Sequence, residues 1–219
     1  MQQCPLCLSQ SMSFYHRDKK RSYFQCTACQ LVSVPPAHHL SAVQEKLEYD
    51  KHQNSPDDIG YRKFLSRILV PLFEQMRPGS IGLDYGCGPG PTISVMAQEA
   101  GLAVSNYDPF FANYPERLTS QYDFITLTEV IEHVSRPAEL LPSLNQLLKP
   151  KGILAIMTKR VKDLTAFSQW HYKNDPTHIN FYSVTTFEWI AQKMNWTLKV
   201  IDKDVVFFYQ SSVYSPDYQ

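Results

Sequence analysis

The sequence predicts an α/β fold, in which a doubly wound and mostly parallel sheet ends in an antiparallel hairpin and follows a small N-terminal module. From residue 61 onward, short apolar runs alternate with helical patterns, which is typical of a parallel sheet with helices on both faces. Two adjacent β-rich runs, 196–201 and 205–209, predict the hairpin. Four of the 5 cysteines fall within the first 29 residues. The expected units are therefore a module over 1–36, a connecting segment over 37–60 and an α/β domain over 61–219.

The N-terminal module carries two C-x2-C pairs with 18 residues between them. Each pair can place two thiolates on one metal ion, and four thiolates complete a closed tetrahedral zinc site. The intervening stretch is rich in aromatic residues and predicts a β-hairpin, so the module is interpreted as a zinc ribbon with a structural zinc ion. Its predicted ligands are Cys4, Cys7, Cys26 and Cys29.

A basic tip, formed by Arg17, Lys19, Lys20 and Arg21, lies within the predicted hairpin. Basic residues beside aromatic ones can contact RNA. A solvated turn carries the same charges without any partner. Both interpretations of the tip remain open at this point.

The connecting segment predicts a short helix over 41–49 and a loop over 50–60. The run 49–58 can form a lid over a site or serve as a plain linker. Apolar residues then follow a three-and-four spacing from Tyr61 to Met76, which predicts an amphipathic helix that Pro71 bends.

Within the α/β domain, the apolar runs predict strands over 81–85, 103–107, 122–127 and 152–157. Helices are expected over 91–101, over 137–148 after Ser135, and up to residue 194 after Ser183 as N-cap. In parallel sheets, ligands bind at the carboxyl ends of the strands. Candidate site residues are therefore sought at that edge.

A glycine-rich loop is the sharpest signal of the chain. The segment Leu83-Asp84-Tyr85-Gly86-Cys87-Gly88-Pro89-Gly90 holds three of the chain's 8 glycines. Glycine lets the backbone approach a ligand closely, so the loop is expected to bind one; a tight turn without a ligand is the alternative. Asp108, after the second strand, can accept hydrogen bonds from both hydroxyls of a ribose. Asp84 can either stabilise the conformation of the loop or bind a cationic amine of the ligand.

Three segments together resemble motifs of the class I S-adenosylmethionine-dependent methyltransferase family. Residues 83–90 are similar to its first motif, 122–134 to its fourth-strand motif, and 147–154 to the turn into its fifth strand. The resemblance implies a Rossmann-like fold, S-adenosylmethionine as cofactor and methyl transfer as the reaction. The cofactor-binding residues are then expected to be Asp84, Gly86, Cys87, Gly88, Gly90, Asp108, Pro109, Thr128, Glu129 and His133. Only 13 residues separate Asp108 from Tyr122, too few for the family's usual helix and third strand.

The methyl acceptor is expected near the run 170–182, which is aromatic and polar and links the fifth strand to the next helix. His171 and His178 in this run are the candidate general bases, and each is also credible as a hydrogen-bonded structural histidine. His133 is expected to hold the loop after the fourth strand.

The net charge and the absence of certain motifs disfavour some classes of function. The 21 basic and 21 acidic side chains give a net charge of +0, whereas a protein built to hold phosphate backbones usually shows a basic excess. No apolar run reaches the roughly 18 residues of a membrane span, and no secretory signal is recognised, so a cytoplasmic protein is expected. The Asn/Asp-Pro-Pro-aromatic motif of base-amine methylation is missing at residues 128–131.

Three hypotheses follow from these observations. The first is an enzyme that methylates a small molecule at O, N or C. The second is an RNA methyltransferase that grips its substrate with the zinc ribbon. The third is a protein that binds S-adenosylmethionine without turnover.

Overall fold

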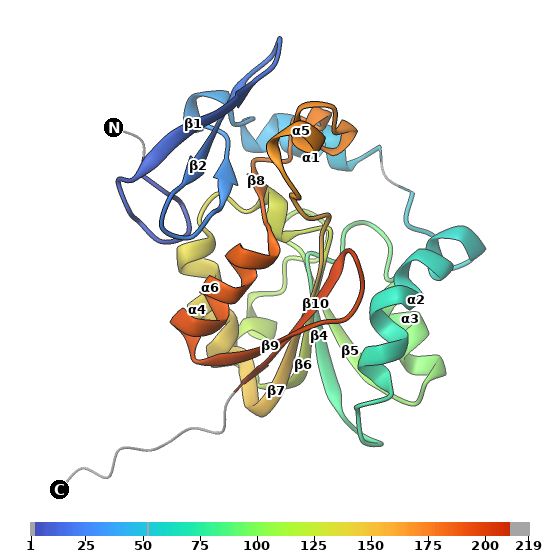
Figure 1. The fold of residues 1–219 in the computed structure, drawn as a ribbon. Coiled ribbons are helices and arrows are strands. Elements are labelled where there is room, and N and C mark those ends of the chain that lie inside the picture. The colour runs from blue at the N-terminus through green and yellow to red at the C-terminus, as the bar shows by residue number, and fades with distance from the viewer. Residues whose placement is uncertain (1–2, 52, 211–219) are drawn as a thin grey trace, which may run out of the picture.

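The computed structural model describes residues 3–51 and 53–210. His52 of the predicted lid and residues 211–219 of the predicted α/β domain therefore lie outside the described residues. The chain forms two sheets, one of six strands in the order β5-β4-β6-β7-β10-β9 and one of four in the order β1-β2-β3-β8 (Figure 1). In this view the smaller sheet lies above the larger one, on the side of the carboxyl ends of the parallel strands.

The six-stranded sheet confirms the predicted fold class. Its parallel strands are β4 (Ile81–Tyr85), β5 (Ala103–Tyr107), β6 (Tyr122–Thr128) and β7 (Leu148–Met157). The hairpin strands β9 (Trp196–Val200) and β10 (Val205–Gln210) close one edge, with β10 antiparallel to both β7 and β9. β7 starts four residues before the predicted strand, because the expected turn at Lys151 (φ 66°) is an irregularity within the strand.

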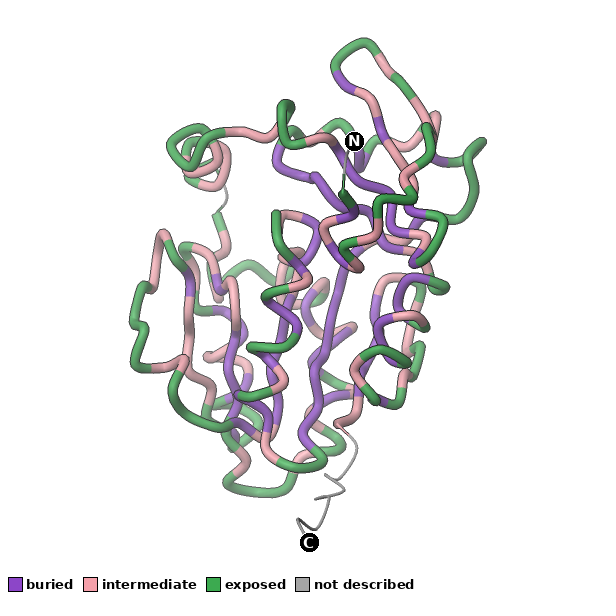
Figure 2. The backbone as a smooth tube through the Cα atoms, turned by 90° about the vertical axis from the view of Figure 1, so that its left-hand side faces the viewer, coloured by how far each residue is buried: buried purple, intermediate pink, exposed green. Residues whose placement is uncertain are grey.

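Two helices cover each face of this sheet. Successive side chains of a central strand therefore pack alternately against the apolar sides of one helix pair and of the other. Ile153, Ala155 and Met157 of β7 pack toward α2 (Ile59–Phe73) and α3 (Thr92–Glu99). Leu154 and Ile156 pack toward α4 (Pro137–Leu147) and α6 (Val184–Met194). The buried strands therefore lie between half-exposed helices (Figure 2). No described helix is long and apolar enough to cross a membrane.

Helix ends show where local signals were sufficient. Ser183 caps α6 as predicted, since its side chain accepts a hydrogen bond from the Thr186 N–H. Ser41 caps α1 (Ala42–Tyr49) in the same way. Ser135 does not cap α4, whose N-cap position is Arg136 without a side-chain cap. Pro71 lies in the last turn of α2, which ends at Phe73 and not at Met76.

The N-terminal sheet is completed by the α/β domain. Its own strands are β1 (Met12–Arg17), β2 (Ser22–Cys26) and β3 (Val32–Ser33), and β8 (Asn180–Phe181) pairs antiparallel with β3. A shared apolar cluster reinforces the pairing, because Tyr23 packs edge-on against Phe167 and Phe181 with ring centroids 5.1 and 5.9 Å away. The module and the chain segment that precedes α6 therefore form one packed unit.

Short elements fill the connections. They are η1 (Pro36–His38), η2 (Pro115–Thr119), η3 (Ile131–His133), α5 (Leu164–Ser168) and η4 (His171–Asn174). Between β5 and β6 the chain forms only η2 and an isolated bridge from Asp108 to Ala112, in agreement with the short spacing.

Candidate functional site

A cavity of about 530 Å³ lies at the carboxyl ends of β4, β5 and β6, which is the size of a small-molecule site. The glycine loop, the end of β6, and the segments around residues 45–64 and 175–178 surround it. The lining residues are Glu45, Tyr49, Asn54, Tyr61, Phe64, Asp84, Tyr85, Gly86, Cys87, Gly88, Pro89, Ile93, Asp108, Pro109, Phe110, Phe111, Thr128, Glu129, Val130, His133, Val134, Asp175 and His178.

Glycine is required in the loop after β4 for two separate reasons. Gly86 and Gly88 have φ values of 81° and 63°, which other residues adopt only with strain. A Cβ atom on Gly86 would lie 2.5 Å from Val130 Cγ2. A Cβ atom on Gly90 would overlap the backbone oxygen of Asn54, so this glycine admits the connecting segment and does not itself line the cavity.

Asp108 joins the glycine loop to the end of β5. Its Oδ2 accepts a hydrogen bond from the Gly88 N–H at 3.0 Å, and its Oδ1 accepts from the N–H groups of Phe110 and Phe111 at 2.8 and 3.1 Å. An ionised carboxylate offers about four acceptor positions. The Oδ2 atom of Asp108 therefore keeps acceptor capacity at the cavity, as the hydroxyls of a ribose require.

The cavity is acidic. Its lining contains the carboxylates of Glu45, Asp84, Asp108, Glu129 and Asp175, and none of the described residues that line it is Lys or Arg. Burial raises the pKa of Asp84 to about 7, although Thr126 donates a hydrogen bond to it. Burial and then the nearby Glu132 carboxylate raise the pKa of Glu129 to about 8. Carboxylates that lack a cation of their own suit a positively charged ligand.

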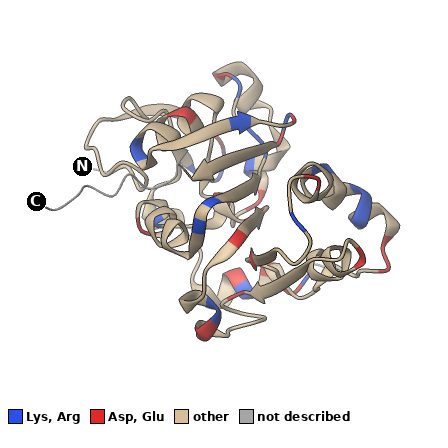
Figure 3. Ribbon diagram, turned by 90° about the horizontal axis from the view of Figure 1, so that it is seen from below, with Lys and Arg blue, Asp and Glu red and all other residues tan. Residues whose placement is uncertain are grey.

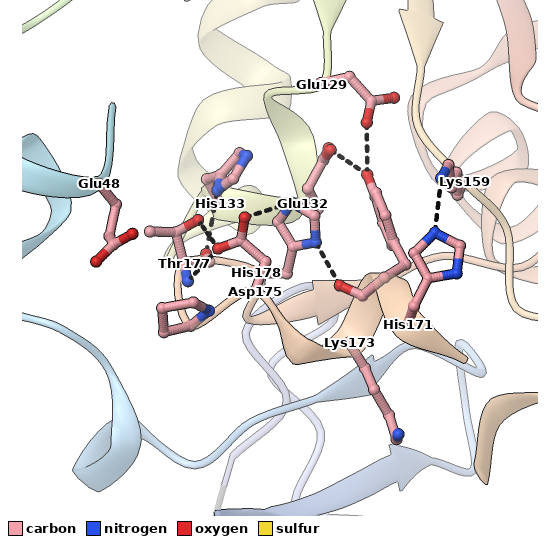
Figure 4. Close-up of polar contacts among 12 residues, drawn as sticks. Glu48, Glu129, Glu132, His133, Lys159, His171, Lys173, Asp175, Thr177 and His178 are labelled. Carbon is pink, nitrogen blue, oxygen red and sulfur yellow. Dashed lines mark hydrogen bonds and ion pairs between the residues drawn. The ribbon is translucent and has the colours of Figure 1, made fainter. Parts of the chain in front are cut away.

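The end of β6 is strained. Glu129 has a φ of 53°, an unusual value for a residue other than glycine, and its N–H donates to Met157 O at 2.8 Å. The Tyr172 hydroxyl contacts both Glu129 Oε2, at 3.1 Å, and Glu132 Oε1 (Figure 4). Backbone strain of this kind persists where the surroundings fix it, and it is concentrated at functional sites.

Of the two predicted general bases, only His178 lies at the cavity. Its Nδ1 is 2.7 Å from Tyr172 O, and its ring centroid is 4.7 Å from that of His133. Burial and then His133 lower the pKa of His178 to about 4, so the ring is neutral near pH 7 and a weak base. His171 is exposed, lies 3.3 Å from Lys159 Nζ through Nε2, and is not part of the lining.

Nine of the ten predicted cofactor residues line the cavity, and Gly90 is the exception. Their contacts with the cofactor remain predictions. Tyr49 and Asn54, which belong to the run 49–58 given as a lid or a plain linker, also line the cavity. The sequence reasoning missed Glu45 and Tyr61, which approach the site from α1 and α2. It also missed Tyr172 and Asp175, whose only signal was their place in the aromatic run 170–182.

The four N-terminal cysteines form one cluster. The sulfur atoms of Cys4 and Cys29 are 3.5 Å apart, those of Cys7 and Cys26 are 3.4 Å apart, and all four lie within 4.8 Å of one another. Zinc–sulfur bonds of about 2.3 Å give a tetrahedron with edges of about 3.8 Å, so the cluster fits zinc and is consistent with a zinc ribbon.

Both cysteine pairs lie in the same kind of turn. The Leu8 N–H donates to Cys4 O at 3.0 Å and the Gln30 N–H to Cys26 O at 2.9 Å, and both donors have positive φ values, 62° and 61°. Cys4, Cys26 and Cys29 are fully buried, which leaves no opening for a substrate.

Arg21 corrects the prediction of a basic tip. Its side chain is 7% exposed and points into the protein, where the guanidinium donates to Asp175 O at 2.7 Å, Pro176 O at 3.2 Å and Lys173 O. The other members of the tip, Arg17, Lys19 and Lys20, are exposed. Arg21 therefore ties the N-terminal module to the loop that carries Asp175 and His178.

Comparisons with known proteins agree with this geometry. A family model described as a methyltransferase domain matches residues 58–199. The ubiquinone biosynthesis O-methyltransferase of Pseudomonas aeruginosa is 29% identical over 91 residues, which are 42% of this chain and 39% of that protein. Its counterpart from Photorhabdus laumondii is 32% identical over 71 residues, 32% of this chain and 30% of that protein. The matched part thus spans well under half of these curated relatives.

Solved structures share the fold. A SAM-dependent methyltransferase from Archaeoglobus fulgidus aligns with a TM-score of 0.51 and 18% identity, over 63% of this chain and 71% of that one. A methyltransferase of calicheamicin biosynthesis, solved with SAH bound, aligns with a TM-score of 0.50 and 10% identity, over 78% of this chain and 59% of that one.

Proposed function

The chain belongs to the family of S-adenosylmethionine-dependent methyltransferases, and we propose that its acceptor is a hydroxyl group of a small molecule. The curated relatives support the choice of oxygen, since they are named O-methyltransferases. The cavity supports the choice of a small molecule, because its volume suits one cofactor and a compact acceptor.

The acidic lining is the observation that carries the proposal. Five carboxylates face the cavity, and no described lining residue is Lys or Arg. The phosphate backbone of RNA would be repelled there, whereas a sulfonium and an ammonium group would be attracted. Basic residues elsewhere are dispersed over several elements (Figure 3). The exposed Arg17, Lys19 and Lys20 favour the second candidate, an RNA substrate, which the inward direction of Arg21 weakens.

The geometry supports a role for several of the lining residues in holding the cofactor. Asp108 would accept hydrogen bonds from its ribose hydroxyls, and the glycine loop would approach it through backbone atoms. Asp84 and Glu129 would face its positive charges. The bound cofactor supplies an activated methyl group, and methyl transfer is an in-line displacement that depends chiefly on alignment. The protein's main task is therefore to hold the acceptor oxygen behind that methyl group.

Methyl transfer from labelled S-adenosylmethionine tests the acceptor class. The acceptors would be a panel of phenols, vicinal diphenols and aliphatic alcohols, with total RNA as the competing substrate and the Asp108→Ala variant as the inactive control. We expect label in at least one hydroxyl compound and none in RNA. Label in RNA alone would overturn the proposal and favour the ribbon-assisted RNA enzyme.

A further inference from the structure

A second pocket, of about 130 Å³, lies between the N-terminal module and the loop that bears Asp175. Its lining residues are Lys20, Arg21, His38, Asn174 and Pro176. Asp175 lines the large cavity, whereas the residues on either side of it line this pocket, so the loop separates the two spaces. Three of the five lining residues are basic, and none of those described is Asp or Glu. This space, the basic pocket, is therefore distinct from the proposed cofactor site.

Arg21 forms the buried side of the basic pocket and is only 7% exposed. Its guanidinium donates four hydrogen bonds, to three backbone carbonyls and to the Tyr23 hydroxyl. These acceptors are neutral, and within the described part of the chain Arg21 has no ion pair. A guanidinium has five N–H groups, so one remains on Nη1, the nitrogen that contacts Pro176 O. Buried charges are normally paired, so Arg21 points to a missing anion.

The carboxylates next in sequence to the lining residues are engaged elsewhere. Asp175 faces the large cavity, and its Oδ1 accepts hydrogen bonds from the N–H and the hydroxyl of Thr177. Asp18 Oδ1 accepts from two backbone N–H groups of the hairpin turn, and its Oδ2 accepts from the Tyr23 hydroxyl at 2.8 Å. Neither carboxylate lines the basic pocket, so neither supplies the anion that Arg21 lacks.

A second buried cation lies beside the basic pocket. Lys173 is 5% exposed, and its ammonium donates a long hydrogen bond to Trp170 O at 3.4 Å. Figure 4 shows its side chain directed away from Asp175. Burial opposes the ionisation of Asp18, but two backbone N–H groups, the Tyr23 hydroxyl and the charge of Lys173 together lower its pKa. Even with Asp18 ionised, the surroundings of the pocket keep an excess of positive charge.

We propose that the basic pocket binds the phosphate group of a small phosphorylated molecule. Pockets for whole small molecules usually hold about 300 Å³ or more, so this smaller one suits a single functional group. A phosphate ester carries about 1.5 to 2 negative charges at pH 7, and its oxygens accept from guanidinium and ammonium groups.

The surroundings favour a small molecule over RNA as the source of the phosphate. Lys20, His38 and Asn174 are exposed, so the rest of the molecule would extend into solvent. None of the described lining residues is Phe, Tyr or Trp, whereas proteins that bind single-stranded RNA usually stack its bases on such rings. The site does not depend on the proposed function. Its ligand would brace the loop 174–176 from the side opposite the large cavity.

Calorimetric titration with inorganic phosphate tests the basic pocket without measuring methyl transfer. The sample is the full-length, zinc-loaded protein in a phosphate-free buffer of constant ionic strength. We expect one saturable site per chain, with millimolar or tighter affinity. Lys20→Glu should weaken phosphate binding at least about tenfold, because it replaces a cation at the pocket by an anion. The matched control is Lys19→Glu, the same charge change on an exposed neighbour outside the lining, which should bind phosphate almost as the original protein does.

Two competitors identify the source of the phosphate. Glycerol phosphate presents a terminal phosphate group, whereas a single-stranded RNA oligonucleotide without terminal phosphates presents only diesters. We expect the first to compete with inorganic phosphate and the second not to compete. Absence of a saturable phosphate site, or equal weakening by Lys19→Glu and Lys20→Glu, would overturn the proposal. Competition by the RNA would overturn it in favour of a nucleic-acid contact.

Discussion

The cysteine cluster and the cavity are lined by different kinds of side chain. The cluster gathers four sulfur atoms, three of its residues are fully buried, and it offers nothing to a substrate. The cavity gathers five carboxylates and the rings of His133 and His178 around about 530 Å³ of open space. The first region can stabilise a fold, and the second can hold charged ligands and act on them. The difference separates structural from chemical roles within one chain.

The two regions are nonetheless coupled. β8 pairs with β3 of the N-terminal sheet, and Arg21 of the same module holds the backbone of residues 173–176. Asp175 belongs to this segment and His178 follows it, and both line the cavity. The module therefore serves the cavity by fixing one of its walls.

Loss of a cysteine ligand should give the largest effect. We expect Cys29→Ser to lose its zinc and to destabilise the module by several kcal/mol, because binding of a structural metal is part of its folding free energy. A zinc assay and thermal unfolding would measure this. Cys87→Ser, which alters the cysteine outside the cluster, is the matched control and should keep its zinc. A Cys29→Ser protein with full zinc content would contradict the assignment of the cluster.

The coupling itself is tested by Arg21→Met, which keeps an unbranched apolar stem and removes the guanidinium. Three carbonyl oxygens lose a charged donor, so we expect a loss of about 3 kcal/mol in unfolding free energy and severalfold weaker binding of S-adenosylmethionine. Denaturant unfolding and calorimetric titration would measure the two effects. Arg17→Met, on the exposed face of the same hairpin, is the control. Unchanged binding of S-adenosylmethionine in Arg21→Met would show that the module does not position the wall.

A smaller effect, and one of opposite sign, is expected at Asp84. Its pKa is raised from 3.8 to about 7 in the folded protein, so the folded state without ligand loses stability as the pH rises from about 4 through 7. Asp84→Asn should remove that loss and stabilise the ligand-free protein at pH 8 by about 1–3 kcal/mol. It should also weaken the binding of the cationic cofactor.

Thermal unfolding between pH 5 and 8 measures the stability part of this prediction. The exposed Asp57→Asn is the control and should follow the original pH profile. If Asp84→Asn is less stable than the original protein at pH 8, the carboxylate is a structural group and not one that awaits a cation.

Local signals were enough to predict much of the fold. β4 and β5 begin and end at the predicted residues, because glycines and prolines bound short apolar runs. The glycine loop and Asp108 lie at the cavity because the order of strands and helices in a parallel sheet determines which loops share an edge. These features depend on neighbours close in sequence or on topology.

The remaining features depend on contacts between distant residues. Arg21 meets acceptors more than 150 positions away, and the two-residue strand β8 carries no periodicity. Asn54 covers Gly90 through its backbone, which no side-chain pattern reveals. His171 and His178 lie in the same aromatic run, and only the turn η4 directs one outward and the other to the cavity.

Calorimetric titration with S-adenosylmethionine is the most direct test of the central claim, which is that this cavity binds the cofactor. We expect one site per chain with micromolar affinity, and binding at least about 100-fold weaker in Asp108→Ala, because the ribose hydroxyls lose a charged acceptor. No binding by the zinc-loaded original protein, or equal binding by Asp108→Ala, would contradict the account.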